Sequence, residues 1–516
     1  MADYTREEVE AILAEIGAAL EAREAEEEFV EEFEDEVEEE AEPEETEEPS
    51  GETGEETQET TDESPNENAL QEQEEEAGEE ETREDFPLKG CDLSGLDLSQ
   101  LNFYRTNLSE SNLKGTDLSE SDLSEVTLEK TILQSANLSD TNLTGADLTG
   151  ADLTDATLKE ANFQEAVLTK ADLSRANLER ANLRESKFIE SNLTGCNLNE
   201  TDCGRAEFLR AKLPGAKIID SDLTRARFRG ADLTGTDLTD SKLSMGIFFE
   251  ANFRKANLNR ARIKGAQLAG GDFTEARLTR ADLTNADLTE AKIHRADLTR
   301  ANLNGSILRR TDLHHSNLSE TNLNIADLTG ASLVNVILSG ADLGRIKLQE
   351  AKLNGARLSK ANLKKAKLAR TQLANADLSG ANLTGAILCQ AHLEGTDLSR
   401  ANLTEADCEG ADFKNTFLIG AELQNANMME TNLDGSDLSG VRAVKANFSK
   451  ASLKGATFRR ADLEYANFNQ ATLCKVDLTG AKLGEANFKG ADLSDADLKD
   501  ADVTDTDFSG TIGTKR

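Results

Sequence analysis

A repeat of five residues runs through most of this chain and restricts its possible folds more than any other feature. From residue 86 to residue 510 the sequence divides into 85 consecutive blocks of five, without one insertion or deletion. The third residue is Leu in 63 blocks and Phe in 14, and the first is Ala, Ser, Thr, Cys or Gly in 77. This period matches neither a strand (about 2) nor a helix (about 3.6). The chain is therefore expected to turn a corner in every block, with the first and third side chains pointing inward.

The phenylalanines at the third position indicate how many blocks close one coil. Two sets of four are spaced by twenty residues and share one phase of a twenty-residue cycle: Phe188, Phe208, Phe228 and Phe248, then Phe448, Phe468, Phe488 and Phe508. With four blocks per coil, each set would stack as one internal aromatic column, in which offset rings pack well. We therefore expect about 21 coils in a rod on the order of 100 Å long, because stacked strands lie ~4.8 Å apart.

The residues within the blocks resemble the consensus of a known repeat family. ADLTG ADLTD (146–155), ADLSR ANLER (171–180) and ADLSG ANLTG (376–385) resemble the A(D/N)LXX consensus of the pentapeptide-repeat family. The resemblance covers about four-fifths of the chain. It implies an all-β fold, a right-handed, four-sided parallel β-helix over residues 86–510, followed by a short tail at 511–516. The Asp or Asn before the central Leu suits a turn, because its short side chain bonds nearby backbone amides.

Residues 1–85 form an acidic extension of different composition. Residues 1–86 hold 39 Asp or Glu and three Arg, so they carry −36 of the total charge of −43, and the repeats carry only −7. Residues 38–85 are too poor in apolar groups to offset the entropy of ordering, so the extension is expected to be mostly disordered.

One helix is expected near residues 6–27 of this extension. Thr5 and Glu8 form a capping-box pattern, and apolar residues follow at helical spacing: Val9, Ile12, Leu13, Ile16 and Leu20. Two interpretations stay open, a helix that docks on a partner and a marginal helix on a solvated arm. The repeat is expected to be capped at its start, where Phe86, Leu96 and Leu101 replace small residues, and near Gly513, where the frame ends.

The composition excludes several classes of protein. The acidic first thirty residues do not resemble a secretory signal, and no apolar run reaches the ~18 residues of a membrane span. Six cysteines without a CxxC pair argue against a disulfide framework and a zinc finger. A cytoplasmic protein without membrane association is expected.

No catalytic motif or cofactor site is recognisable. The chain has four histidines, and His294 and His314 lie twenty residues apart with His315 beside them. They are expected to form an exposed ladder of imidazoles, although a transition-metal site is conceivable there. No metal site is predicted.

Two surface features are candidates for partner binding. Four apolar residues at outward positions are either scattered surface residues or a contact strip for a partner or for self-association: Ile189, Leu209, Ile247 and Phe249. Residues 351–376 contain no acidic residue and form what we call the basic belt: Lys352, Arg357, Lys360, Lys364, Lys365, Lys367 and Arg370. Smaller basic bands occur at 251–265 and 442–460.

These features predict a non-catalytic scaffold, a stiff rod that presents its walls to protein partners, with self-association possible. The alternative is a DNA mimic that regulates a type II topoisomerase, because the best-known pentapeptide-repeat proteins act in this way. Against it, this repeat lacks the interrupting loops of several of those relatives, and its charge of −7 is far below the one charge per ~1.7 Å of duplex DNA. Nucleic-acid binding is not expected, because the acidic extension would compete with phosphates. The sequence does not identify the partner.

Overall fold

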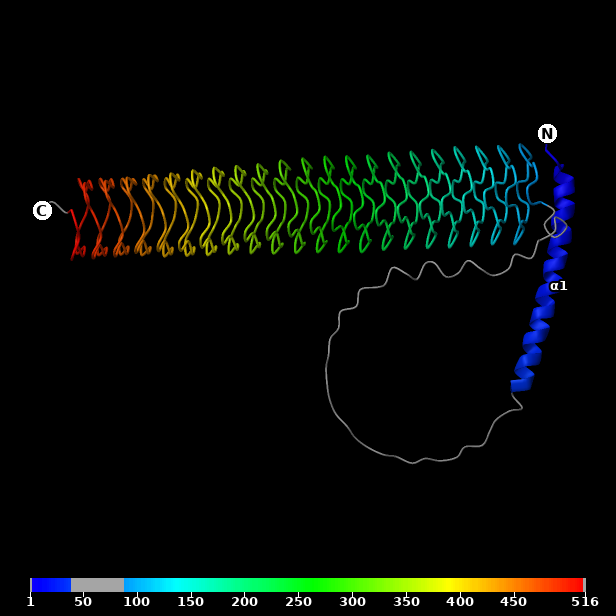
Figure 1. The fold of residues 1–516 in the computed structure, drawn as a ribbon, viewed down its shortest axis with the longest axis horizontal. Helices are drawn as coiled ribbons and strands as arrows, with labels where there is room; N and C mark the ends of the chain where they lie inside the picture. Colours follow the sequence, from blue (N-terminus) through cyan, green and yellow to red (C-terminus); the bar gives the residue numbers. More distant parts are fainter. Residues whose placement is uncertain (1, 39–87, 514–516) are drawn as a thin grey trace, which may run out of the picture.

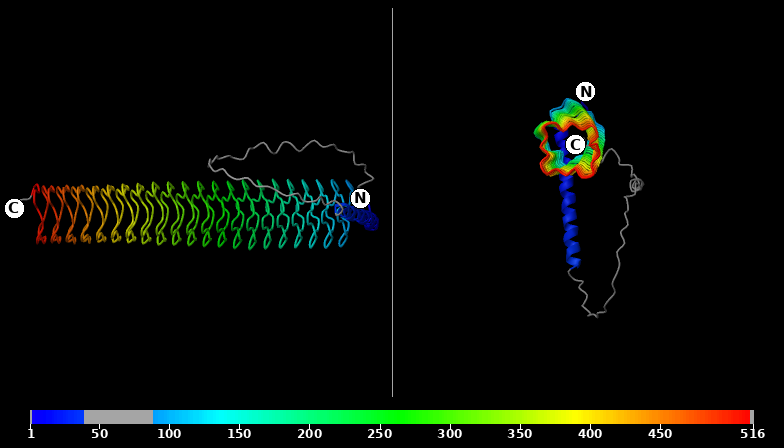
Figure 2. Two further views of the ribbon diagram at one scale, coloured as in Figure 1. Left: turned by 90° about the horizontal axis from the view of Figure 1, so that it is seen from below. Right: turned by 90° about the vertical axis from the view of Figure 1, so that its left-hand side faces the viewer.

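The computed structural model describes residues 2–38 and 88–513, which form a rod of stacked coils and one helix (Figure 1). Parallel bridges join the second residue of each block to the residue twenty positions later, from Asp92 with Asn112 to Asp492 with Ile512. Four blocks therefore make one coil, as the phenylalanine spacing predicts. Viewed along the rod, successive coils superpose closely (Figure 2). Among the described residues, no helix has the length and apolarity needed to cross a membrane.

The fifth residue of every block forms a corner of the coil. From residue 90 to residue 510 each has a positive φ, and 59 of these 85 residues are not glycine. Left-handed backbone costs a residue with a side chain about 1–2 kcal/mol, so the packing inside the rod must offset this strain.

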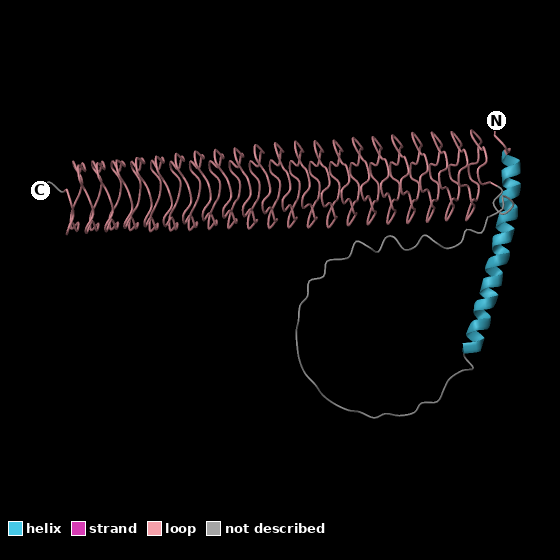
Figure 3. Ribbon diagram, in the orientation of Figure 1, coloured by secondary structure: helices cyan, strands magenta, loops and turns pink. Residues whose placement is uncertain are grey.

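The close spacing of the corners corrects the expectation of an all-β fold. In the described coils the bridges are isolated, and none extends into a strand (Figure 3). A left-handed residue at every fifth position interrupts the extended backbone before a longer ladder can form. The parallel pairing that defines a β-helix is present all the same.

Inward side chains fill the rod as predicted. Ring centroids lie 4.8 Å apart for Phe188 and Phe208, 4.4 Å for Phe208 and Phe228, and 5.1 Å for Phe228 and Phe248, with nearly parallel planes. The second set, which begins at Phe448, is stacked in the same way. The predicted internal aromatic columns are confirmed.

The second residue of each block holds neighbouring coils and corners together. The amide of Leu93 donates to the carbonyl of Asn112, and the amide of Asn112 donates to the carbonyl of Cys91, both at 2.8 Å. Within the block, Oδ1 of Asp92 accepts the amide of Ser94 at 3.0 Å, which is the predicted turn role of Asp and Asn. This pattern recurs along the rod and fixes the register of every coil.

Replacing a small inward residue by a large one should destabilise the rod. Ala361 is buried, and leucine there would overpack the interior, so we expect Ala361→Leu to cost about 1–3 kcal/mol. Lys364, in the same block, points outward and is exposed, and Lys364→Ala should cost less than about 0.5 kcal/mol. Thermal unfolding of both variants checks this prediction, and equal shifts of the midpoint would contradict the assignment of inward and outward positions.

Helix α1 spans Arg6–Glu38 and lies across the N-terminal end of the rod (Figure 1). It is longer than the predicted range of 6–27. The capping box is present, because the amide of Thr5 donates to Oε2 of Glu8 at 2.7 Å and the amide of Glu8 donates to Oγ1 of Thr5 at 3.3 Å. The expectation of disorder concerns residues 39–85, which lie outside the described part of the chain, as does the proposed capping residue Phe86.

Residues near the start of the chain make contacts with the first described coil that a preceding coil makes elsewhere in the rod. Asp3 donates its amide to the carbonyl of Asp92 at 2.5 Å and accepts the amide of Asp92 at Oδ2 at 2.7 Å. Arg6 donates to the carbonyls of Asp97 at 3.1 Å and Ser99 at 3.0 Å. Elsewhere in the rod, amides of the preceding coil donate to carbonyls at these block positions.

Apolar side chains complete this contact. Val9 of α1 is fully buried in the same apolar cluster as Leu88, with Ile12, Leu13, Leu96 and Leu101 packed against it. The structure matches neither interpretation of the helix: the apolar residues of α1 are not solvated, and the surface that they cover is the end of the rod itself and not a partner.

The two ends of the rod differ. Ala496, Leu498, Ala501 and Phe508 are only partly buried, and Ile512 is 62% exposed. Up to residue 513, nothing described covers the last coil, so the cap expected near Gly513 is absent from this part of the chain. Capping is provided at the N-terminal end by α1.

Candidate functional site

Many charges on the rod have a partner of opposite charge on an adjacent coil. Side chains twenty residues apart stand one above the other, and opposite charges meet there. Examples are Arg175 with Asp155 at 2.7 Å and Arg180 with Glu200 at 2.9 Å. Each such exposed pair contributes little to stability. Their effect is to leave the parts of the wall where they occur nearly neutral.

The basic belt departs from this pattern. All seven of its cations are exposed, and in the described part of the chain only Arg370 forms an ion pair, with Glu350 at 3.4 Å. The sequence explains why, because the residues twenty positions from Lys360 are Gly340 and Gly380. In the smaller band at 251–265, by contrast, Arg260 pairs with Asp240 at 2.5 Å. Six of the seven belt cations are therefore without an ion pair among the described residues, and together they run around one coil of the rod.

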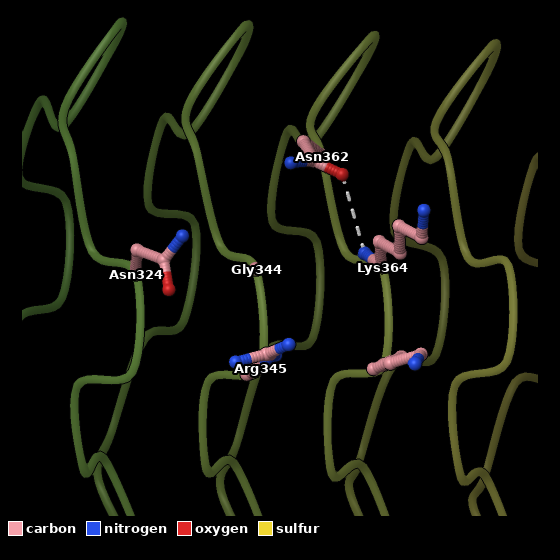
Figure 4. A pocket seen from close by; sticks show the side chains of 6 residues that line it. Asn324, Gly344, Arg345, Asn362 and Lys364 are labelled. Atoms are coloured by element: carbon pink, nitrogen blue, oxygen red, sulfur yellow. Dashed lines mark hydrogen bonds between the residues drawn. The ribbon is translucent and has the colours of Figure 1, made fainter.

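A shallow depression of about 290 Å³ lies at the edge of the belt (Figure 4). Its lining residues are Asn324, Gly344, Arg345, Asn362, Lys364 and Lys365. Gly344 lacks the side chain that would fill the space, and a Cβ there would lie only 3.1 Å from Nδ2 of Asn324. Arg345, Lys364 and Lys365 provide three cations, and among the described residues they form no ion pair. The depression can accept an anionic group such as a carboxylate.

Among the four residues of this depression that sequence reasoning missed, besides Asn324 and Asn362, are Arg345 and Gly344. Both lie outside the range 351–376, on the preceding coil. The signal was available in the twenty-residue period, because Arg345 stands one coil before Lys365 and Gly344 one coil before Lys364. To find such a charged site, residues twenty positions apart have to be compared as well as residues that are neighbours in the sequence.

The predicted apolar strip is less prominent than expected. Ile189, Leu209, Ile247 and Phe249 are half-buried. More exposed apolar side chains occur elsewhere, such as Phe417 at 50% and Ile419 at 44%, which the sequence analysis did not single out. The role of the strip as a contact site stays a prediction.

The cysteines offer no reactive thiol in the core. All six are free, and Cys91, Cys196, Cys203 and Cys408 are buried. Burial raises the pKa of Cys196 and of Cys203 to about 12, so both remain protonated at neutral pH. A nucleophilic role requires the thiolate.

The histidines form the expected ladder together with a carboxylate that the sequence analysis had not connected to them. The ring centroids of His294 and His314 lie 3.8 Å apart, and the ring centroid of His315 lies 5.4 Å from that of His314. Asp312 contacts both His294 and His314 at 2.7 Å. Burial raises the pKa of Asp312, but hydrogen bonds from His314 and His294 outweigh it and hold this pKa below its usual value.

Comparison with known proteins identifies the repeat. The family model "Pentapeptide repeats (8 copies)" matches ten segments, nine of them within residues 88–380 and one near the end of the repeat. The matched segments are 88–124, 121–159, 161–199, 186–225, 206–244, 247–274, 266–305, 306–345, 341–380 and 475–510. The chain belongs to the pentapeptide-repeat family. A second family model, "Pentapeptide repeat region", matches residues 391–468. No curated protein matches this pentapeptide-repeat chain.

Several solved structures are similar to it. HetL, a pentapeptide repeat protein involved in heterocyst differentiation regulation in the cyanobacterium Nostoc sp. strain PCC 7120, is 32% identical over 44% of this chain and 90% of its own, with a TM-score of 0.18. QnrB1, a plasmid-mediated fluoroquinolone resistance protein, is 19% identical over 40% of this chain and 90% of its own, with a TM-score of 0.22. A pentapeptide repeat protein from the Arabidopsis thaliana thylakoid lumen is 22% identical over 21% of this chain and 70% of its own, with a TM-score of 0.11.

Proposed function

We propose that this pentapeptide-repeat protein is a non-catalytic scaffold whose basic belt docks an acidic segment of a protein partner. The observation that carries this proposal is the contrast in charge pairing. Six of the seven belt cations have no ion pair among the described residues, whereas cations elsewhere on the rod commonly face an acid one coil away.

The rigid wall supports binding of an extended anionic chain. Side chains one coil apart repeat at the spacing of stacked strands, ~4.8 Å, and left-handed corners fix the backbone that carries them. Because this backbone is preorganised, only the side chains lose entropy on binding. Complementary charge also raises the rate of association and favours anionic partners.

A peptide-binding measurement tests the proposal. We expect the full-length protein to bind a fluorescent Glu-rich peptide of about 20 residues at low salt, and to release it at ~500 mM salt, where the Debye length is about 4 Å. The variant Lys352→Gln, Lys364→Gln, Lys365→Gln should bind at least about tenfold more weakly, because it removes three unpaired charges.

A matched variant distinguishes the effect of the belt cations from the effect of net charge on peptide binding. Arg175→Gln, Arg180→Gln, Arg205→Gln removes the same three charges, but each of these arginines is already ion-paired. We expect its affinity to stay within about twofold of the unmodified protein. Equal losses in the two variants would contradict the proposal. Inhibition of topoisomerase supercoiling by the full chain, unchanged by the belt substitutions, would favour the alternative function as a DNA mimic.

A further inference from the structure

A second site lies on the wall of the rod at His294, Asp312 and His314. The two histidines occupy the fourth position of blocks one coil apart, and Asp312 occupies the second position of the block that contains His314. Nε2 of His294 lies 2.7 Å from one carboxylate oxygen of Asp312, and Nδ1 of His314 lies 2.7 Å from the other. One ligand atom from each of the three residues lies within 4.8 Å of the other two.

This cluster is a variant of an arrangement that the coil builds elsewhere. At Asp297, one carboxylate oxygen accepts the hydroxyl of Thr299 from the same block at 2.5 Å. The other accepts the hydroxyl of Thr279 from the preceding coil at 3.2 Å. His314 and His294 take the places of these two threonines around Asp312. The fold therefore aims two fourth-position groups at one carboxylate, and here both groups are imidazoles.

Two imidazole nitrogens and a carboxylate oxygen are a ligand set for borderline divalent ions such as Zn²⁺ and Cu²⁺. Ligand atoms around tetrahedral Zn²⁺ lie 2.0–2.2 Å from the metal and hence about 3.3–3.6 Å from one another. The three ligand atoms of this cluster lie within 4.8 Å of one another, so small side-chain rotations would bring them to that separation. Each of the three side chains is about one-third exposed, so an ion can enter from solvent and keep water at its remaining positions.

The concentration of histidine at this point is a second observation. The chain has only four histidines, and three of them gather here, because His315 lies beside His314. The fourth, His392, is elsewhere on the rod. We propose that His294, Asp312 and His314 form a binding site for one divalent transition-metal ion, Zn²⁺ or Cu²⁺. This departs from the sequence-based expectation of a ladder without metal, and the position of Asp312 is the reason.

Titration of the full-length protein, freed of metal by dialysis against a chelator, tests this inference. Calorimetry with Zn²⁺ should reveal one site that His294→Ala and His314→Ala each weaken at least tenfold. His392→Ala, which changes the one histidine outside the cluster, should leave that site unaltered. Circular dichroism of each variant checks that the rod remains folded, as expected for partly exposed side chains.

Electron paramagnetic resonance of the Cu²⁺-loaded protein identifies the metal ligands independently of the binding affinity. We expect nitrogen hyperfine coupling from two imidazoles in the unmodified protein and from one in His314→Ala. The numerous carboxylates of residues 1–86 bind ions weakly, and they would give oxygen coordination that no histidine substitution alters. Coordination by oxygen alone, or equal zinc affinity in His294→Ala and His392→Ala, would overturn the inference.

Discussion

Phe228→Ala is expected to lower the free energy of unfolding by about 3–5 kcal/mol, because it leaves a cavity in the middle of an aromatic column. Phe228 is fully buried, and its ring stacks on Phe208 at 4.4 Å and on Phe248 at 5.1 Å. The substitution removes both stacking contacts and the buried area of the ring. Urea unfolding followed by circular dichroism measures the change, reported as the shift in midpoint if the transition has several steps.

The control for this prediction is an outward phenylalanine. Phe417 is 50% exposed, and Phe417→Ala should cost less than about 1 kcal/mol. Because a solenoid is stabilised by each coil and its neighbours, the damage should also be local. Hydrogen exchange should accelerate in the coils around residues 208–248 and stay unchanged near residue 408. A uniform acceleration along the rod, or equal shifts for the two variants, would contradict this description of the core.

The core of the rod could be predicted from the sequence because the five-residue period assigns each side chain a direction. Phe188 and Phe208 are twenty residues apart in sequence and adjacent in space, so the period alone determines their contact. The strain at the corners was harder to anticipate. Only 26 of the 85 corner residues are glycine, so residues such as Ile325 and Tyr465 adopt left-handed backbone without a local signal.

The docking of α1 could not be predicted, because its cause lies in the tertiary structure. The apolar stripe of Val9, Ile12 and Leu13 is the same whether it covers a partner, the rod or nothing. The position of α1 is determined by the end of the first described coil, where the carbonyls of Asp97 and Ser99 accept hydrogen bonds from Arg6. A sequence pattern describes the helix but not the surface that it completes.

The candidate sites, too, have features that the sequence predicts and features that depend on how the chain is coiled. The composition of the basic belt was evident along the chain, but its unpaired state depends on the residues one coil away, such as Gly340 and Gly380. The contact of Asp312 with His294 spans eighteen residues, an offset that links the second position of one block to the fourth position of another. Such diagonal contacts become visible only once the path of the coil is known.

Val9→Asp is expected to release α1 from the rod. Val9 is fully buried among the apolar residues of the first coil, and a carboxylate there would lose its hydration without gaining a partner. The capping hydrogen bonds from Asp3 and Arg6 to the first coil should be lost with it. We expect hydrogen exchange at the first-coil amides, including that of Asp92, to accelerate by at least about a hundredfold, equivalent to about 3 kcal/mol.

The matched control is Ala11→Asp, which introduces the same side chain two residues away on an exposed face of α1. It costs more in helix propensity than Val9→Asp does, because Ala is the best helix former, and it adds the same charge, but it does not touch the rod. Exchange in the first coil should therefore stay within about twofold of the unmodified protein. Because each coil protects the next, fraying in Val9→Asp should decline along the rod and be absent near the Phe188 column. If Val9→Asp accelerates exchange in the first coil no more than Ala11→Asp does, and both leave it slow, α1 is a dispensable arm and the first coil holds its own end closed.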